Sequence, residues 1–320
     1  MHWLAERHDL EYAPELARNT QALRNALHYV RGLVIPPQVA VDTLLLRAAP
    51  RLRALGRVSS GAENIDLQAC SAANVEVVRS TADSAAAEAE FMIGALLAML
   101  RRVPVVCSDG TMAGRELGCS TIGLIGMTAS AKLLAQLLPA FGCRVLGYDP
   151  ALHPNDPLWV RWGIVPSGLR ELMEQSDGVC LQLPYYQRFR GLLGERVLAN
   201  AKAAQVLVSI SHSALFDETA LAQALGSGRL AAAWLDSVEP GLLEVDRPLR
   251  NLPNLQVSPR VASTTRESRK RAAWAVARRI DELLYQESPA SREFRATMPG
   301  EEFAAIRGAS TEPSIDPLLR

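Results

Sequence analysis

The sequence carries no excess charge of either sign. Lysine plus arginine number 34 and aspartate plus glutamate also number 34, so the 320-residue chain has a formal net charge of zero. Proteins that bind nucleic acids through electrostatics usually show a basic excess. The composition therefore argues against a nucleic-acid partner, and the basic stretch 266–271 is interpreted as a solvated helix face.

Long apolar runs and paired cysteines are also lacking. The longest apolar stretch, Phe91–Leu100, is too short to cross a bilayer, and the polar start of the chain lacks the apolar segment of a signal peptide. The five cysteines are scattered without a C-x-x-C pair, which predicts reduced thiols rather than disulfides or a metal site. Together these absences predict a cytoplasmic protein with no membrane partner and no bound metal.

Short apolar runs alternate with helical patterns along most of the chain. This alternation predicts an α/β fold of parallel, doubly wound sheets, and the length predicts two domains. The predicted strands are 10–12, 33–35, 58–62, 75–79, 121–125, 145–148, 178–183, 205–210, 231–235 and 254–257. The predicted helices are 3–8, 15–27, 39–48, 65–73, 84–102, 129–141, 167–175, 198–202, 217–226 and 266–285.

The two ends of the chain differ from this regular pattern. An α/β domain normally opens on a strand, but no strand pattern precedes the first helix, so either that strand is missing or the true start lies upstream. The last residues, 286–320, show weak periodicity and are expected to form a loose tail.

One strand–helix–strand unit, Thr121–Pro150, organises the rest. Gly126 follows the first strand and allows a tight turn, and Asp149 ends the second strand 23 residues later. This layout is typical of a dinucleotide site, in which the pyrophosphate lies at the helix N-terminus and the acid meets the adenosine ribose. A carboxylate at this position favours NAD over NADP, because it would repel the 2′-phosphate.

The glycine fingerprint of such sites is altered here. Where G-x-G-x-x-G is expected, the three glycine positions are Gly126, Thr128 and Ala131. Alanine is permitted at the third position, but Thr128 adds a Cβ where the pyrophosphate approaches, although its hydroxyl can donate a hydrogen bond to a phosphate. Two interpretations stay open: an NAD site, or a structural unit that no longer binds a dinucleotide.

Several stretches, in the correct order, resemble the D-isomer-specific 2-hydroxyacid dehydrogenases, the family that includes phosphoglycerate and glyoxylate reductases. The resemblance implies two Rossmann-like domains, with a dinucleotide-binding domain at 88–259 inserted into a smaller, flavodoxin-like substrate domain formed by 1–87 and 260–320. It also implies a homodimer and a small-molecule carboxylate substrate. The stretches are 57–67 (RVSSGAENIDL), 89–102, 121–150, 208–221 (VSISHSALFDETAL) and 233–259.

The resemblance also assigns ligand-binding positions. Asp149 matches the ribose-binding acid, Asp236 the aspartate that meets the nicotinamide carboxamide, and Pro184 the proline of the adenine-side loop. Ser60 and Gly61 match the loop whose backbone N–H groups receive the substrate carboxylate.

The family's three catalytic side chains are not in their usual places. The arginine that holds the substrate carboxylate is replaced by His212, and the acid–base histidine is replaced by Arg260. The spacing from Asp236 places the glutamate partner of that histidine at Gly241. Glu239 can take this role only if the loop slips locally by two residues.

These exchanges leave several hypotheses open. In one hypothesis the roles are swapped: Arg260 binds the carboxylate, and His212, tuned by Glu239, is the acid–base group. In the other, the residues drifted after activity was lost. The function is then an NAD-linked oxidoreductase acting on a small 2-hydroxy or 2-oxo acid through a rearranged site. The alternatives are a catalytically inactive NAD(H)- or metabolite-binding homologue that serves as a sensor or partner, or a non-redox reaction in the same cleft. Fold alone does not choose among them.

Overall fold

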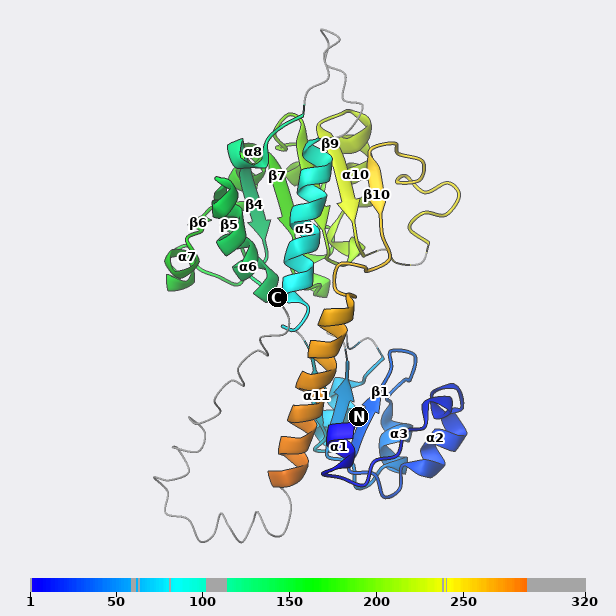
Figure 1. Cartoon of the computed structure of the whole chain (residues 1–320). Coiled ribbons are helices and arrows are strands. Elements are labelled where there is room, and N and C mark those ends of the chain that lie inside the picture. The colour runs from blue at the N-terminus through cyan, green and yellow to red at the C-terminus, as the bar shows by residue number, and fades with distance from the viewer. Residues whose placement is uncertain are drawn as a thin grey trace. The chain divides into compact units, whose positions relative to one another are not determined.

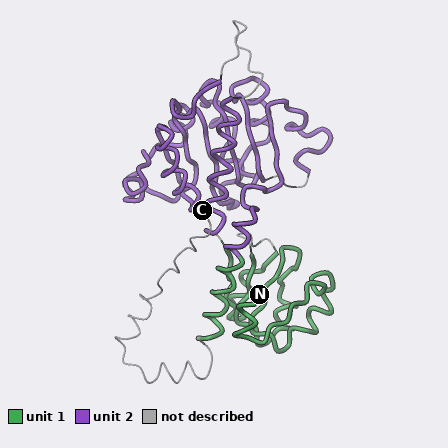
Figure 2. The backbone as a smooth tube through the Cα atoms, in the orientation of Figure 1, with its two compact units in different colours: residues 1–80, 273–320 green, residues 81–272 purple. Residues whose placement is uncertain are grey.

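The chain forms two compact units (Figure 2). The computed structural model describes residues 2–58, 62, 64–80, 82–101, 114–237, 239 and 241–286. One unit comprises Met1–Ser80 and Ala273–Arg320, and the other comprises Thr81–Ala272. The chain returns to the first unit within helix α11 (Arg266–Gln286), so Arg260 belongs to the same unit as Asp149 and His212. Both units are parallel α/β structures, which confirms the predicted fold class.

The larger unit, 81–272, is built on a seven-stranded parallel sheet with the order β10-β9-β8-β7-β4-β5-β6 (Figure 1). The order reverses between β4 and β7, and ligands of such sheets bind outside the carboxyl ends of the strands at this switch point. The strands are β4 (Thr121–Ile125), β5 (Arg144–Tyr148), β6 (Val165–Pro166), β7 (Gly178–Leu181), β8 (Gln205–Ser209), β9 (Leu230–Leu235) and β10 (Leu255–Val257).

Helices cover both faces of this sheet, because its strand residues alternate between two apolar clusters. Leu124 lies in the cluster under one helical layer, and its neighbour Ile125 lies in the other. The first layer contains α5 (Ala85–Leu100), α6 (Ala129–Leu137) and α7 (Pro157–Trp162). The second contains α8 (Leu169–Gln175), α9 (Glu195–Leu198) and α10 (Glu218–Gly226).

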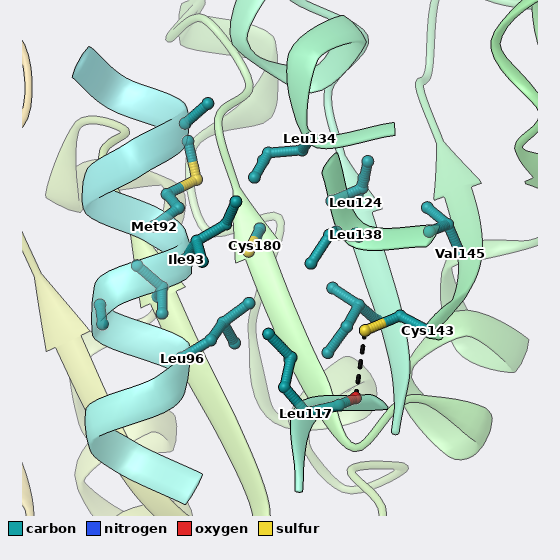
Figure 3. Close-up of a cluster of buried hydrophobic side chains, with 14 of the residues drawn as sticks. Met92, Ile93, Leu96, Leu117, Leu124, Leu134, Leu138, Cys143, Val145 and Cys180 are labelled. Atoms are coloured by element: carbon teal, nitrogen blue, oxygen red, sulfur yellow. Dashed lines mark hydrogen bonds between the residues drawn. The ribbon is translucent and has the colours of Figure 1, made fainter. Parts of the chain in front are cut away.

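Figure 3 shows the first cluster, where α5 packs its apolar side chains toward β4 and β7. The thiol of Cys143 donates a hydrogen bond to the Leu117 carbonyl at 3.1 Å. Burial raises the pKa of Cys143, and burial beside Cys143 raises the pKa of Cys180 to about 12. These thiols therefore stay protonated and act as small apolar side chains. The four cysteines that the structure describes are all free.

The smaller unit has a three-stranded parallel sheet, β1-β2-β3. Its strands are β1 (Gly32–Ile35), β2 (Ala54–Arg57) and β3 (Glu76–Arg79). Helices α2 (Thr20–Ala26), α3 (Thr43–Ala48) and α4 (Leu67–Ala72) contribute to one apolar cluster on this sheet. The second cluster is formed by α11 through Val276, Ile280 and Leu284, packed with strand residues Ala54 and Val78.

Several predicted elements of the smaller unit are wrong. Residues 10–12 form no strand, and the strand predicted at 58–62 instead lies at Ala54–Arg57. The single helix predicted over 15–27 is divided into the 3₁₀ helix η1 (Pro14–Arg18) and α2, because the Asn19 side chain caps a new helix at the Ala22 N–H. The helix predicted from residue 39 begins at Thr43, since the Asp42 carboxylate accepts the Leu45 N–H at 2.8 Å.

The remaining elements are short. They are α1 (His2–Ala5) and the 3₁₀ helices η2 (Leu117–Cys119), η3 (Leu138–Phe141), η4 (Gln187–Phe189) and η5 (Ser213–Leu215). Elements α7 and β6 were absent from the sequence-based prediction. Among the residues described, no helix combines the length and apolar character needed to cross a membrane.

Candidate functional site

The predicted site residues of the larger unit gather at one edge of its sheet. Each follows the end of a strand, and the strands are parallel, so their carboxyl ends meet at that edge. Gly126 follows β4, Asp149 follows β5, Pro184 follows β7, His212 follows β8, Asp236 follows β9, and Arg260 follows β10.

The turn after β4 requires glycine at Gly126. Its φ is +97°, a left-handed conformation that side-chain-bearing residues rarely adopt, and its N–H donates to the Tyr148 carbonyl at 2.8 Å. A Cβ added there would lie 2.7 Å from the backbone nitrogen of Leu183, which follows β7. The turn and the chain leaving β7 are thus in direct contact at the switch point.

Thr128 does not distort this turn. Its backbone is extended, with φ −84° and ψ 179°, so the backbone conformation does not require glycine. Its hydroxyl caps α6 by accepting the Ala131 N–H at 3.4 Å and lies 2.9 Å from the Ser130 hydroxyl. Ala131 is fully buried in the first turn of α6. The altered fingerprint therefore still presents a helix N-terminus at the edge of the sheet.

Asp149 and Gln182 complete the arrangement around the turn. The Asp149 carboxylate accepts the Met127 and Ala151 N–H groups, each at 2.8 Å, which ties the end of β5 to the turn. The Gln182 side chain is buried beside Ser130, and its Nε2 has no hydrogen-bond partner in the described part of the chain. An orphaned buried donor, a glycine turn and a strand-end acid fit the pyrophosphate and ribose of a dinucleotide.

The three predicted catalytic residues meet at the Glu239 carboxylate. Its Oε1 lies 3.2 Å from Nε2 of His212 and 3.7 Å from Nη2 of Arg260. Its Oε2 accepts the Ser213 N–H at 3.1 Å and also the Ser213 hydroxyl. The structure thus brings Glu239 to His212, although the sequence spacing pointed to Gly241, which has a φ of +89°.

The orientation of the His212 ring is defined on both nitrogens. Nδ1 accepts the Ala214 N–H at 3.1 Å, so the ring proton lies on Nε2 and faces Glu239. The ring also stacks on Tyr185, with centroids 4.6 Å apart and an interplanar angle of 22°. The imidazole is therefore held by a backbone N–H, a carboxylate and an aromatic ring.

Arg260 has a φ of +57°, which is costly for a residue with a long side chain. Its N–H donates to the Asp236 carbonyl at 2.9 Å and the Ser258 carbonyl at 3.0 Å. The buried Asp236 carboxylate accepts the Ala262 and Val261 N–H groups at 2.7 and 2.9 Å, and also the Ser258 hydroxyl. Asp236 therefore organises the segment that carries Arg260, and its expected contact with a nicotinamide carboxamide stays a prediction.

Other predicted positions stand apart from this cluster. Pro184 is exposed at the end of β7, and Ser60 and Gly61 lie outside the described residues. Arg57, a buried arginine at the end of β2, was not singled out from the sequence. No group of histidine, cysteine, aspartate or glutamate side chains in the described ranges is arranged to hold a metal ion.

Ser213 is the contact that sequence reasoning missed within the cluster. It stands where the motif A-R-G of the resembled family has glycine, and Tyr185 stands where P-L-T has leucine. Tyr185 stacks on the exchanged residue His212, and Ser213 hydrogen-bonds Glu239, which is displaced along its loop. The sequence did contain a signal for these contacts. A serine stands at a motif glycine, and a larger side chain stands at a motif leucine.

Comparison with known proteins identifies the family. The profile of the D-isomer specific 2-hydroxyacid dehydrogenase NAD-binding domain matches residues 95–262. The chain is 31% identical over 254 residues to an (S)-sulfolactate dehydrogenase of Chromohalobacter salexigens, covering 77% of this chain and 82% of that protein. The chain belongs to this family. It is a D-2-hydroxyacid dehydrogenase-like, NAD-dependent oxidoreductase, which confirms the resemblance and the predicted cofactor.

Two further comparisons give the extent of the similarity. A D-3-phosphoglycerate dehydrogenase of Mycobacterium tuberculosis is 31% identical over 259 residues, covering 78% of this chain and 48% of that protein. The chain thus spans about half the length of that relative. A crystal structure of a protein from Thermus thermophilus superimposes with a TM-score of 0.71 at 26% identity, covering 85% of this chain and 88% of that one.

Proposed function

We propose that the chain catalyses NAD-linked oxidation or reduction of a small 2-hydroxy or 2-oxo carboxylate, with the roles of histidine and arginine exchanged between their two positions. The observation that supports this proposal is the Glu239 carboxylate, which contacts both His212 and Arg260. The swap predicts a cluster of all three side chains, whereas drift after loss of activity sets no such requirement.

In this proposal His212 is the acid–base group. During oxidation its Nδ1 accepts the proton of the substrate hydroxyl, and during reduction it returns a proton to the carbonyl oxygen. Glu239, at Nε2, stabilises the charged ring that forms. The Ala214 N–H occupies Nδ1 at 3.1 Å, so productive binding requires the substrate oxygen to take its place.

Arg260 binds the substrate carboxylate in this scheme. Its side chain is 54% exposed and Nη2 lies 3.7 Å from Glu239, so the guanidinium is accessible to an added carboxylate. Its left-handed backbone is a strained feature of the kind that clusters at functional sites. The resemblance also keeps Ser60 and Gly61, which lie outside the described residues, as proposed substrate-binding positions.

The cofactor is held by the residues around the β4 turn. Gly126, the Thr128-capped helix α6 and Ala131 would receive the pyrophosphate, Asp149 the ribose, and Pro184 the adenine side. When bound, NAD supplies the hydride acceptor or donor for the substrate carbon. The larger unit is accordingly proposed as the dinucleotide domain and the smaller unit as the substrate domain.

The resemblance to the family supports a proposed assembly, and the composition supports a proposed location. We propose a cytoplasmic homodimer that acts on a free small molecule and binds no nucleic acid. The relatives are named for sulfolactate and phosphoglycerate, both small 2-hydroxy acids. Size-exclusion chromatography with light scattering tests the dimer, which a monomeric mass at working concentration would rule out.

The central experiment has two stages. NADH binding is measured by fluorescence titration of the full chain, and turnover is then measured with sulfopyruvate, hydroxypyruvate, 3-phosphohydroxypyruvate, glyoxylate and pyruvate. The proposal expects saturable NADH binding and turnover of at least one of these acids. Turnover that survives in either His212→Ala or Arg260→Ala contradicts the exchanged roles. NADH binding without any turnover favours the inactive homologue.

A further inference from the structure

The Glu239 carboxylate is held differently at its two oxygens. Oε2 accepts two hydrogen bonds from one residue, the N–H of Ser213 at 3.1 Å and the Ser213 hydroxyl. Oε1 faces His212 Nε2 at 3.2 Å and Arg260 Nη2 at 3.7 Å. One residue therefore fixes the carboxylate, and the other oxygen is left for the groups that carry the proposed chemistry.

We propose that Ser213 is a positioning residue, which holds Glu239 in the orientation that pairs it with His212. The inference rests on the proposed function, because it gives Ser213 a role in the acid–base pair. Ser213 acts through Glu239 and is not assigned a contact with the substrate.

The need for such a residue follows from the sequence spacing. The family's glutamate position is Gly241, and Glu239 lies two residues earlier. A carboxylate displaced along its loop needs a new anchor to reach the imidazole with defined geometry. Ser213 directly follows His212 and replaces a motif glycine, so its hydroxyl adds an anchor that the motif lacks, next to the ring it serves.

The competing anchors are weaker. The Ser237 hydroxyl lies 3.4 Å from Oε1, at the limit of a hydrogen bond, and would compete with His212 for the same oxygen. Tyr185 holds the ring of His212 by stacking, so it orients the imidazole and not the carboxylate. Among the described neighbours, only Ser213 hydrogen-bonds Oε2.

The test compares Ser213→Ala, which removes the hydroxyl, with Ser213→Thr, which keeps it. The first readout is the Nε2–H proton resonance of His212 in the ¹⁵N-histidine-labelled full chain without substrate. The sequence has five histidines, and His212→Gln assigns the resonance by its disappearance. The wild type and Ser213→Thr should show an exchange-protected N–H, and Ser213→Ala should lose that protection, as Glu239→Gln should.

The second readout is kinetic. Ser213→Ala should lower kcat at least about tenfold, since a hydrogen bond to a charged group is lost, with the Kd for NADH unchanged and KM altered little. Ser213→Thr should restore kcat to near the wild-type value. The matched control is Ser227→Ala, whose hydroxyl caps the end of α10 by donating to Ala224, and it should change neither readout.

The outcomes separate this inference from the proposed function. A protected His212 resonance that persists in Ser213→Ala, or a wild type that lacks it, overturns the role of Ser213 whatever the turnover. Absence of turnover in the wild type overturns the proposed function, while the resonance still decides whether Ser213 holds the pair. A loss in Ser213→Ala that Ser213→Thr does not restore also contradicts the hydroxyl as anchor.

Discussion

Two carboxylates at opposite edges of the same sheet are each surrounded by cations and backbone donors, yet their settings differ. At the amino edge, Asp177 accepts hydrogen bonds from Lys202 at 2.6 Å, Arg115 at 2.7 Å and the Thr121 N–H at 2.9 Å. We call Asp177, Lys202, Arg115 and Thr121 the amino-edge cluster. Its acid, Asp177, is 4% exposed and directly precedes β7. Thr121 is the first residue of the neighbouring strand β4.

The carboxyl-edge cluster consists of Glu239, His212, Arg260 and Ser213. Its acid is 23% exposed and lies beyond the ends of the strands, on segments without regular structure. The amino-edge acid joins neighbouring strands, so its contacts stabilise the fold. The carboxyl-edge acid contacts residues that lie outside the strands and is itself partly exposed. A ligand can therefore reach this cluster without disturbing the sheet. We therefore propose that a similar set of charges has a structural role at the amino edge and a functional role at the carboxyl edge.

The largest effect is expected for Asp177→Asn. Asp177 is 4% exposed, whereas Lys202 and Arg115 are 40% and 42% exposed and can be solvated once the carboxylate is gone. The main loss is of hydrogen bonds to a charged group, which costs about 1.5–3 kcal/mol. The free energy of unfolding in urea should fall by about this amount, while the Kd for NADH stays unchanged. Glu174→Gln, which breaks the pair with Arg170 on the exposed face of α8, is the control and should leave the urea midpoint in place. A loss of less than about 1 kcal/mol would show that the amino-edge cluster contributes no more to stability than an exposed salt bridge does.

Glu239→Gln should give the reverse pattern. The amide keeps the shape of the side chain but cannot stabilise a charged imidazole, so kcat should fall by up to about 10²-fold. The cost to the free energy of unfolding should stay below about 1 kcal/mol, because the acid is partly exposed. Parallel kinetics and urea unfolding check both values. A large stability loss with unchanged kcat would remove the distinction between the two clusters.

Acid titration sharpens the contrast further. Burial raises the pKa of Asp177, but hydrogen bonds from Lys202, the Thr121 N–H and Arg115 outweigh it and hold that pKa below its usual range. Because the pKa of Asp177 is lower in the folded state, its carboxylate contributes its full stabilisation above the unfolded pKa of about 3.9. This contribution is lost as the pH falls through the folded pKa. Wild-type stability should therefore drop faster than that of Asp177→Asn below about pH 4. Parallel curves for the two proteins in this range would show that Asp177 titrates alike in both states.

The smallest expected effect concerns the Tyr185 ring. Aromatic stacking contributes about 0.5–1.5 kcal/mol, so Tyr185→Leu should lower kcat roughly two- to tenfold by loosening His212. Tyr185→Phe removes only the hydroxyl, which donates to Gln187, and should retain most of the wild-type kcat. If Tyr185→Leu and the wild type have equal kcat, stacking on Tyr185 is not needed to orient the His212 ring.

Buried runs and glycine turns made the larger unit predictable. Strands β4, β5, β7 and β8 are mostly buried and rich in apolar residues, as a sheet covered on both faces requires. Gly126 and Asp149 were recognisable because a positive φ and a strand-end acid restrict the choice of residue. Helix limits were less predictable, since single side chains such as Asn19 and Asp42 decide them through capping bonds.

The carboxyl-edge cluster was predictable only in part. Residue types identified His212 and Arg260, but counting along the chain favoured Gly241 over Glu239. The path of the loop that follows β9 decides whether Glu239 reaches the imidazole. The two hydrogen bonds that Ser213 donates to Glu239 also contribute. Such tertiary contacts leave no periodic signal in the sequence.

Thr128 has a consequence for how dinucleotide sites are recognised. A search for three glycines passes over this chain, because the middle letter is wrong. The backbone at Thr128 is nevertheless extended, and its hydroxyl serves as the first cap of α6. Dihedral angles and capping bonds show that the turn and the helix N-terminus of the motif are kept. Threonine at this position supplies a helix cap that glycine cannot, together with a Cβ where the pyrophosphate would approach.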